Sequence, residues 1–430
     1  MKATDIVVIG GGPAGIMAAG RAAELGASVL LLERNSRLGV KLRISGKGRG
    51  NITNTADIQE FVEAFHPNGK FLYSAFSRFF RDELLELLHK LGVETKAERG
   101  GRIFPVTDRA ADVADALRNW LQSVGVTVKT GVRAKSIAVE RGRVVGVELY
   151  AGSVRCRAAV IATGGASYPK TGSTGDGYVI AEALGHTIVP LKPALAGLIC
   201  AEDWAKELQG LTLRNVVAKL LFEPSGSDTP ARSKPRTVSE EFGEMLFTHF
   251  GVSGPIILTL SRQVGKLLDS GSVYVSIDLK PALDHEKLHA RLIRDFKQKR
   301  YLKNYISELL PKRLGETIIA LAGVPPEKPV NSISVQERNR LVDLVKDLRF
   351  RVVGLAPIEE AIVTAGGVSL KEIDPKTMMS KIVNGLFFAG EVMDIDARTG
   401  GFNMQAAFST GWIAGESAAQ YVMDICDKWR

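Results

Sequence analysis

A strand, a glycine-rich turn and a helix follow one another at the start of the chain, and this order constrains the fold more than any other feature. Residues 5–9 form a short apolar run typical of a buried strand, and Gly10, Gly12 and Gly15 follow in G-x-G-x-x-G spacing. The first glycine permits a tight turn, the second lets a pyrophosphate approach the backbone, and the third lets helix and strand pack closely. The sequence therefore predicts a Rossmann-type nucleotide site.

The residues after this turn narrow the choice of nucleotide. Residues 16–25 have helical spacing, residues 28–32 form a second apolar strand, and Glu33 follows that strand, 18 residues after Gly15. A carboxylate at this position accepts hydrogen bonds from ribose hydroxyls, which favours FAD or NAD over NADP. A glycine-rich turn without a ligand is the alternative, but the complete order of strand, turn, helix, strand and acid argues against it.

The bulk properties are those of a globular protein with more than one domain. The 430 residues suggest two or three domains, and 45% hydrophobic and 24% charged residues are ordinary proportions. The early first strand leaves no room for a signal peptide, no apolar run reaches the roughly 18 residues of a membrane-spanning helix, and three cysteines are scattered, so we expect a cytoplasmic protein. His285 and His289 are four residues apart without a carboxylate motif, and we expect no metal site.

The net charge of +9 lies mostly in the middle of the chain. Residues 191–354 hold 25 Lys and Arg against 19 Asp and Glu. Within "RLIRDFKQKRYLKNY" (residues 291–305), basic side chains alternate with Phe296, Tyr301 and Tyr305, a composition that can bind phosphates and stack on bases. A polyanionic partner would explain this charge, and a solvated basic surface is the alternative.

The chain changes character twice, which predicts an α/β, Rossmann-like FAD-binding domain interrupted by an insertion. Residues 1–190 and 355–430 have the pattern of the nucleotide domain, whereas residues 191–354 are β-rich with a smaller helical part at about 286–350. We expect one long amphipathic helical stretch over about 286–321. Only one complete G-x-G-x-x-G occurs, so we expect that any nicotinamide nucleotide visits without a Rossmann domain of its own.

The C-terminal stretch favours FAD over NAD. The run "GLFFAG" (residues 385–390) is a strand that ends in Gly390 and Glu391, and "TGGFNMQAA" opens a helix near Asn403. FAD is long and needs contacts from a second strand end, and the N–H groups of a helix N-terminus can stabilise negative charge on a reduced flavin. A glycine-rich loop before an ordinary helix is the alternative.

Seven stretches follow one another in the order of a known family: "IGGGPAG", "KLRISGKGRGNITN", "GRIFPVTDRAADV", "VIATGGASYPKTGSTGDGY", "GEMLFTHFGVSGP", "TAGGVSLKEIDPKTMMSK" and "LFFAGEVMDIDARTGGFNMQAAFSTG". They cover nearly the whole chain, and on them it resembles the BaiN/RdsA-type family of NAD(P)/FAD-dependent oxidoreductases, also called aminoacetone-oxidase-like flavoproteins. The resemblance implies non-covalently bound FAD, with NAD(P)H as a transient electron donor.

The resemblance also implies which residues contact the FAD. They form the pyrophosphate turn, the ribose and adenine end, a loop along the flavin, and the far end near the ring: Gly10, Gly12, Pro13, Ala14, Gly15, Glu33, Arg34, Lys41, Ser45, Gly46, Gly48, Arg49, Gly50, Asn51, Val132, Thr163, Gly164, Gly390, Glu391, Phe402, Asn403 and Met404. In the loop, the glycines would form a backbone nest for anions and Arg49 would supply positive charge. Val132 would hold the adenine through its backbone.

The catalytic residues are less well defined. Many family members carry "GRCN" where this chain has "GRGN", so Gly50 replaces a cysteine that could donate a proton, and a packing role at this position is the alternative. The remaining candidates near the ring are Tyr168, Lys170, His249 and Ser253. His249 could titrate near neutral pH, or it could be a surface histidine.

Three functions are compatible with these observations. The family resemblance includes enzymes that reduce a uridine of 23S ribosomal RNA to dihydrouridine, and the basic insertion agrees with an RNA partner whose target base is flipped or single-stranded. A small-molecule flavin oxidase or reductase acting on an amine or an enone-like compound is the second, and a non-catalytic FAD-binding protein is the third. The charge distribution favours the first.

Overall fold

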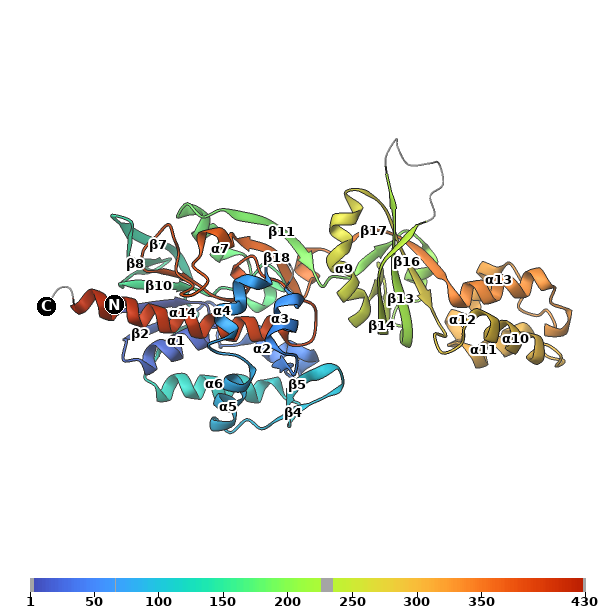
Figure 1. Cartoon of the computed structure of the whole chain (residues 1–430), viewed down its shortest axis with the longest axis horizontal. Helices are drawn as coiled ribbons and strands as arrows, with labels where there is room; N and C mark the ends of the chain where they lie inside the picture. The colour runs from blue at the N-terminus through green and yellow to red at the C-terminus, as the bar shows by residue number, and fades with distance from the viewer. Residues whose placement is uncertain (1–3, 66, 226–234, 428–430) are drawn as a thin grey trace. The chain divides into compact units, whose positions relative to one another are not determined.

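The computed structural model describes residues 4–65, 67–225 and 235–427, and it separates the chain into two compact units (Figure 1). Unit 1 comprises residues 1–194 and 358–430, and unit 2 comprises residues 195–357. Unit 1 is a Rossmann-like α/β domain and unit 2 is a β-barrel with helices, so the predicted fold class is confirmed.

A parallel five-stranded sheet forms the centre of unit 1. Its strand order is β19-β10-β1-β2-β6, and every neighbouring pair is parallel. All residues of β1, β2, β10 and β19 are buried, which explains their continuous apolar sequences. The strands are β1 (Ile6–Ile9), β2 (Val29–Glu33), β6 (Thr127–Thr130), β10 (Ala158–Ile161) and β19 (Leu386–Phe388).

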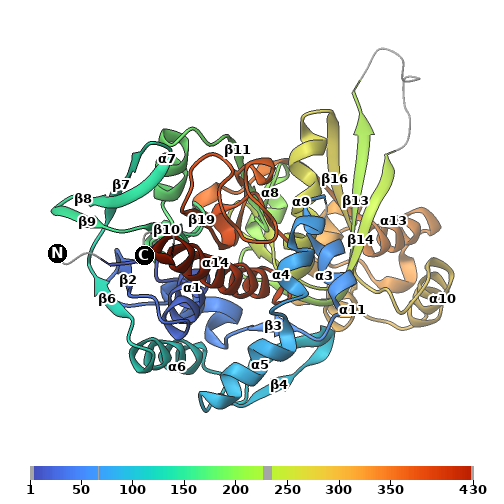
Figure 2. The same cartoon turned by 60° about the vertical axis from the view of Figure 1, so that its left-hand side comes forward.

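The first and last helices of the chain, α1 (Pro13–Glu24) and α14 (Phe402–Asp427), lie side by side on this sheet (Figure 2). Glycines allow the close approach: a Cβ added to Gly411 would lie 2.2 Å from the carbonyl oxygen of Ala14, and one added to Gly415 would lie 2.2 Å from that of Ala18. The C-terminal helix therefore covers the helix of the glycine-rich turn, although the two are almost 400 residues apart in sequence.

Smaller elements complete unit 1. Two three-stranded antiparallel sheets, β3-β5-β4 and β7-β8-β9, and the pair β11-β18 surround the central sheet. Their bounds, with those of the remaining helices, are α2 (Val40–Ile44), β3 (Thr53–Asn54), α3 (Ile58–Ala64), α4 (Tyr73–Phe76), α5 (Arg81–Lys90), β4 (Thr95–Ala97), β5 (Arg102–Pro105), α6 (Ala110–Ser123), β7 (Ala134–Glu140), β8 (Arg143–Leu149), β9 (Gly152–Arg155), α7 (Asp176–Ala183), β11 (Ile188–Ala194) and β18 (Val363–Val368).

His186 is a buried histidine of unit 1 whose two ring nitrogens both have hydrogen-bond partners. The hydroxyl oxygen of Ser380 accepts hydrogen bonds from the backbone N–H groups of Ile382 and Val383, so its own proton is free for Nε2 of His186, 2.8 Å away. Nδ1 then donates to the carbonyl oxygen of Ala181 at 3.3 Å. Burial lowers the pKa of His186, because the charged ring would lose its hydration.

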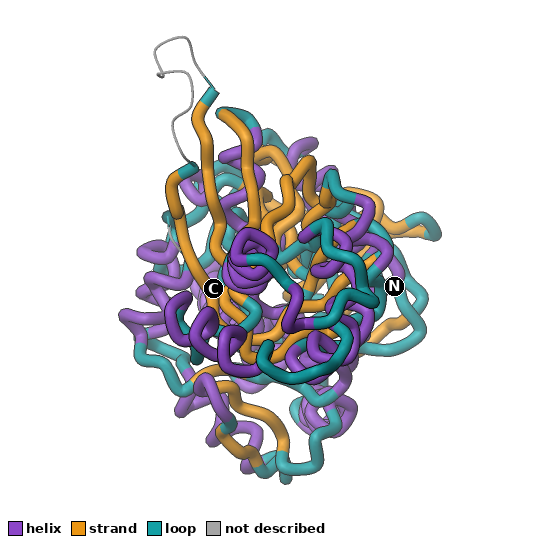
Figure 3. Tube along the Cα trace, turned by 90° about the vertical axis from the view of Figure 1, so that its right-hand side faces the viewer, coloured by secondary structure: helices purple, strands orange, loops and turns teal. Residues whose placement is uncertain are grey.

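In its described residues, unit 2 combines a closed six-stranded barrel with six helices that share its apolar core. The barrel order is β12-β15-β14-β13-β16-β17, and the long strands β13 and β14 stand out among the orange strands of Figure 3. The elements are β12 (Leu198–Cys200), α8 (Asp203–Glu207), β13 (Thr212–Pro224), β14 (Arg236–Thr248), β15 (Gly251–Ser253), α9 (Pro255–Leu268), β16 (Gly271–Asp278), α10 (His285–Asp295), α11 (Leu302–Leu309), α12 (Lys312–Ala322), α13 (Val335–Lys346) and β17 (Leu348–Leu355).

The prediction of one long helical stretch over about 286–321 was wrong. The structure has three separate helices there, α10, α11 and α12. Leu310 precedes Pro311 and has extended backbone angles (φ −132°, ψ 159°), as the proline ring requires of its neighbour, and this ends α11. Apolar periodicity continued across the break because all three helices bury one face in the same core.

None of the described helices is both long enough and apolar enough to cross a membrane. Among the same residues, no group of three or more His, Cys, Asp and Glu side chains is arranged to hold a metal ion. His285 instead contacts Asp343 at 2.8 Å, and His289 contacts Asn339 at 3.0 Å.

Candidate functional site

The three glycines of the first turn have different surroundings. Gly10 has φ +107°, and a Cβ there would lie 2.4 Å from the carbonyl oxygen of Ala162, so this position requires glycine. A Cβ on Gly15 would lie 1.8 Å from the carbonyl oxygen of Gly10, which makes Gly15 a packing position. At Gly12, the N-cap of α1, a Cβ would meet no atom within 4 Å. The space beside Gly12, at the N-terminus of α1, is therefore open, as a phosphate site requires.

Glu33 is buried at the end of β2 and its carboxylate faces the turn. It is 7% exposed, and its two oxygens accept hydrogen bonds from the backbone N–H groups of Gly11 (2.8 Å) and Asn35 (2.7 Å). Gly11 was missed in the sequence, although a Cβ there would lie 2.4 Å from Leu38 and 3.0 Å from the Glu33 carboxylate. Three consecutive glycines were the signal that could have revealed this contact.

Val132 and Arg34 lie at the same end of the site. The N–H of Val132 donates to the carbonyl oxygen of Glu33 at 3.0 Å, so only the Val132 carbonyl remains for an adenine. Arg34 shares the carboxylate of Asp176 with Arg133, which binds it through two hydrogen bonds of 2.7 and 2.8 Å. Burial opposes ionisation of Asp176, but the hydrogen bonds from Arg133 and Thr174 lower its pKa overall.

The loop of residues 45–51 holds its own charge balance. The Arg49 guanidinium binds Glu98 at 3.1 Å and Asp108 at 2.6 Å, and it stacks over the Phe104 ring at 4.3 Å. The hydrogen bonds from Arg49 lower the pKa of Glu98, and hydrogen bonds from Lys96 and Arg49 lower the pKa of Asp108. The charge of Arg49 is thus compensated inside the protein. Gly46 and Gly48 have φ +57° and +86°, and Gly48 faces open space, a backbone geometry that suits the expected anion nest.

Gly50 occupies a packing position. It is buried with φ +81°, and a Cβ would lie 2.9 Å from Cα and 3.1 Å from Cβ of Ala110, at the start of α6. A side chain at position 50 would therefore point at α6, and only glycine fits this backbone without strain.

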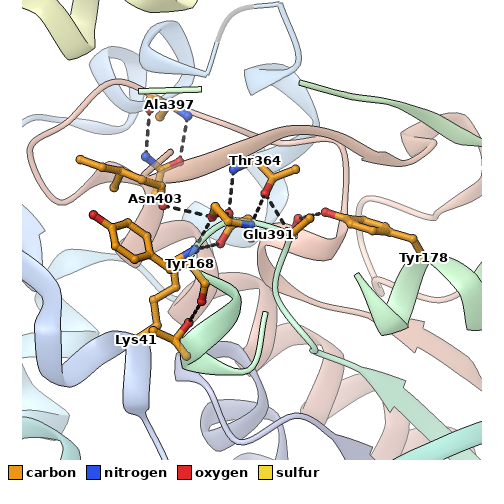
Figure 4. A network of polar contacts seen from close by, with 11 residues as sticks. Lys41, Tyr168, Tyr178, Thr364, Glu391, Ala397 and Asn403 are labelled. Carbon is orange, nitrogen blue, oxygen red and sulfur yellow. Dashed lines mark hydrogen bonds and ion pairs between the residues drawn. The ribbon is translucent and has the colours of Figure 1, made fainter. Parts of the chain in front are cut away.

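Lys41 and Glu391, both expected FAD contacts, bind each other (Figure 4). The Lys41 ammonium donates to Glu391 and to the Ser167 hydroxyl, each at 2.8 Å. The other carboxylate oxygen of Glu391 accepts from the Thr364 N–H at 2.8 Å and from Ser167 at 3.1 Å. This network joins α2, the loop after β10, strand β18 and the turn after β19, four segments that are distant in sequence.

The N-terminus of α14 is held against the loop of residues 45–54. The Asn403 side chain accepts from the Ala397 N–H at 2.8 Å and donates to its carbonyl at 2.9 Å (Figure 4). With its amide oriented to satisfy both neighbours, Asn51 donates to Thr53 and accepts from the Gly401 N–H at 3.0 Å. Sequence reasoning placed these two segments at the flavin ring, and the structure brings them together.

Gly390 and Phe402 connect this end to the rest of unit 1. A Cβ on Gly390, which has φ +75°, would lie 2.9 Å from Ala14 in the first turn of α1, so the two strand ends expected to contact FAD are adjacent. Phe402 is buried against Phe61, with ring centroids 4.5 Å apart, so only its backbone can face a ligand. Met404 is partly buried against the same apolar core.

Two hydroxyl groups of the expected site are buried without a partner. Within the described part of the chain, Oγ of Ser45 and Oγ1 of Thr163 form no hydrogen bond. Beside Thr163, Gly164 has φ +73° and a Cβ would lie 3.0 Å from Ser173. Buried hydroxyls are normally paired, so each of these two groups lacks the hydrogen-bond partner that is usual for its surroundings.

The four catalytic candidates belong to different units. Tyr168 and Lys170 are exposed in unit 1, in the loop after β10. His249 and Ser253 belong to unit 2. His249 is exposed with its ring 5.0 Å from that of Phe250, and Ser253 lies in β15, paired with Leu246. Only Tyr168 and Lys170 therefore share a unit with the nucleotide residues.

The basic stretch of residues 291–305 differs from expectation. The prediction that its three aromatic side chains can stack on bases was wrong for Phe296 and Tyr305, which are buried and pack edge to face at 5.2 Å. Tyr301 is exposed, as are Lys297 and Lys299, for which the described residues provide no ion-pair partner. Phe296 at the end of α10 and Tyr305 in α11 lie on the helix faces that pack into the core, whereas Tyr301 precedes α11 and faces solvent.

The open turn at Gly12, the buried carboxylate of Glu33, the two unpaired hydroxyls and the adjacent strand ends all fit a dinucleotide held along unit 1. The fold and the site together define a flavoprotein oxidoreductase of the Rossmann type. The chain matches the HI0933-like protein Rossmann domain over residues 4–417 and belongs to this family.

Relatives of known function match over almost their whole length. The chain is 31% identical to the ribosomal RNA dihydrouridine synthase of Escherichia coli (97% of this chain, 98% of the relative). It is 30% identical to the 3-dehydro-bile acid delta(4,6)-reductase of Clostridium scindens (96% and 99%). The predicted family resemblance and the oxidoreductase class are confirmed.

Solved structures agree on the fold. The 3-ketosteroid delta1-dehydrogenase of Sterolibacterium denitrificans superposes with a TM-score of 0.51 at 12% identity, over 98% of this chain and 100% of that one. The quinol fumarate reductase subunit of E. coli gives 0.51 at 18% identity, over 99% and 72%. At these identities the likeness concerns the fold alone.

Proposed function

We propose that this protein is an NAD(P)H-driven, FAD-dependent reductase that converts a uridine of 23S ribosomal RNA to dihydrouridine. The observation that carries the proposal is its end-to-end relationship to the ribosomal RNA dihydrouridine synthases of E. coli and Haemophilus influenzae, at 31% and 30% identity. A ribosomal substrate would place its action in the cytoplasm.

The residues of unit 1 would hold the FAD without a covalent bond. Gly12 and the N-terminus of α1 would take the pyrophosphate, Glu33 would accept the ribose hydroxyls, and Ser45 and Thr163 would donate from their unpaired hydroxyls. The α14 N-terminus would face the ring end, with Asn403 fixing the loop before it. When bound, the flavin supplies the hydride chemistry that no side chain can supply.

Unit 2 would contribute affinity for the RNA backbone. Lys297 and Lys299 are exposed beside the exposed ring of Tyr301, a combination that suits phosphate contact and stacking on one unpaired base. Other cations nearby are already paired, such as Arg300 with Glu308 and Lys303 with Glu327, and would contribute less.

A second candidate is the reduction of a small unsaturated metabolite. The bile acid reductase of C. scindens is as similar to this chain as the RNA enzymes are, so sequence identity alone favours neither substrate. The exposed basic residues of unit 2 favour RNA.

The test is nucleoside analysis by mass spectrometry of 23S ribosomal RNA from a bacterial host whose own dihydrouridine synthase gene is deleted. The wild-type chain should restore dihydrouridine, and the Gly12→Glu variant, whose carboxylate would repel the pyrophosphate, should not. Thermal unfolding of purified apo-protein would check that the variant is folded. If the wild-type chain is produced in folded form and restores no dihydrouridine, the RNA proposal is refuted, and enones and amines become the substrates to test by flavin reoxidation.

A further inference from the structure

Tyr168 has a backbone conformation that is unfavourable for a tyrosine. Its φ of +51° and ψ of 59° are left-handed, a region that bulky side chains rarely adopt. The next residue is Pro169, and extended backbone is the conformation favoured before a proline. The observed left-handed conformation therefore departs from what the local sequence favours.

The surrounding structure holds this conformation in place. The N–H of Tyr168 donates to the carbonyl oxygen of Glu359 at 3.3 Å, and its carbonyl accepts from the N–H (2.8 Å) and hydroxyl (2.7 Å) of Thr171. The preceding residue, Ser167, is fully buried and binds Lys41 and Thr364. Strain that is over-determined in this way is concentrated at active sites, where it fixes a group in one position.

The side chain that is fixed so firmly has no structural partner of its own. Tyr168 is 38% exposed, and its hydroxyl forms no hydrogen bond to any residue that the structure describes. In Figure 4 the ring extends away from the contact of Lys41 with Glu391, on the side where Asn403 lies. These three residues are the ones expected at the flavin ring, so the phenol projects from the ring end of the site.

We propose that Tyr168 is the catalytic proton donor of the reduction, an inference that rests on the proposed function. In the reduction of a uridine, the C5=C6 π bond is lost and two C–H bonds form. The hydride that originates from NAD(P)H goes to C6, and the Tyr168 O–H bond breaks to give a proton to C5. The phenolate then takes a proton from water, so one NAD(P)H and one proton are consumed for each dihydrouridine.

The position of Gly50 supports this assignment. The chain has no thiol there, and a side chain at position 50 would point at Ala110. A proton-donating side chain would therefore have to come from another segment, and among the described residues of unit 1 Tyr168 combines exposure, an unpaired hydroxyl and a fixed backbone. A phenol can also bind the substrate without giving up a proton. The Kd for the RNA, the rate of flavin reduction by NAD(P)H and the rate of flavin reoxidation by RNA therefore have to be measured separately.

The experiment uses holo-protein, NADPH or NADH, and unmodified 23S ribosomal RNA transcribed in vitro. Tyr168→Phe should keep the FAD content, the rate of flavin reduction and the Kd for the RNA, while the rate of flavin reoxidation by RNA falls roughly 10²- to 10⁴-fold, the usual contribution of a general acid. Tyr73→Phe, which changes an exposed tyrosine in α4, is the matched control and should behave as wild type.

The outcomes separate the two proposals. If Tyr168→Phe forms dihydrouridine within twofold of the wild-type rate, Tyr168 is not the proton donor, and the proposed function still stands. If the variant loses FAD content or the rate of flavin reduction together with dihydrouridine formation, the role of Tyr168 is structural. If wild-type protein with reducible flavin forms no dihydrouridine, the proposed function fails, and the role of Tyr168 in it fails as well. Tyr168→Gly should raise the thermal midpoint and still lose dihydrouridine formation, since glycine removes the strain; a lower midpoint would contradict the strain argument.

Discussion

Replacing Gly12 by alanine should weaken FAD binding and leave the fold almost intact. A Cβ at this position would meet no atom within 4 Å, and its φ of −81° is open to any residue. Alanine is a poorer N-cap than glycine, which costs less than about 1 kcal/mol. This is a small part of the roughly 5–15 kcal/mol by which folded proteins are stable.

The effect on binding should be larger. The added methyl group would occupy the space in which the pyrophosphate is expected to approach the backbone. Overpacking against a group that cannot move aside costs about 1–3 kcal/mol, which corresponds to an increase in Kd of about 5- to 150-fold. Gly15→Ala is the matched control, because the same methyl group would lie 1.8 Å from the carbonyl oxygen of Gly10 and should destabilise the apo-protein by at least about 1–3 kcal/mol.

Two measurements on apo-protein check this pair. FAD titration followed by flavin fluorescence gives the Kd, and urea unfolding gives the free energy of unfolding. If Gly12→Ala binds FAD as tightly as wild type, the pyrophosphate does not approach at Gly12. If it loses as much stability as Gly15→Ala, the space in front of Gly12 is not open.

Three further predictions concern other positions. Gly50→Cys should lower the free energy of unfolding by roughly 1–3 kcal/mol in urea, because φ is +81° and its Cβ would crowd Ala110; unchanged stability would contradict the packing role. As the pH falls below about 6.5, the unfolded histidine pKa, the unfolded chain takes up a proton that the buried His186 ring resists. The free energy of unfolding of wild type should then fall by up to about 1.4 kcal/mol per pH unit more than that of His186→Gln; parallel Tm–pH curves would refute this. Lys297→Glu combined with Lys299→Glu should weaken RNA binding and reduce the slope of log K against log salt by about 1.4 to 1.8; an unchanged slope would exclude phosphate contacts there.

Local patterns predicted the parts of the fold that depend on local geometry. The spacing of Gly10, Gly12 and Gly15 led to the strand, turn and helix, and in the structure Gly10 lies in the tight turn and Gly15 at a close contact between helix and turn. The apolar runs led to the buried parallel strands for the same reason, since burial on both faces leaves little freedom in sequence.

Contacts between distant segments could not be read in the same way. The pairing of Lys41 with Glu391 spans 350 residues, and the neutralisation of Arg49 by Glu98 and Asp108 depends on where a small sheet folds back. No periodicity encodes such pairs, because each partner alone is an ordinary charged residue. The sequence therefore named Lys41, Arg49 and Glu391 as site candidates but could not indicate their ion-pair partners within the protein.

The way in which the chain leaves and re-enters unit 1 has a consequence for the modularity of the protein. Strands β11 and β18 pair up to Ala194 and Val363, and on the other side of the junction Leu198 pairs with Leu355. Within each unit, the two chain ends at the junction are therefore held at the distance of neighbouring strands. An insertion joined in this way adds little loop-closure entropy to its host, so a different module joined at the same two strand ends should leave unit 1 folded.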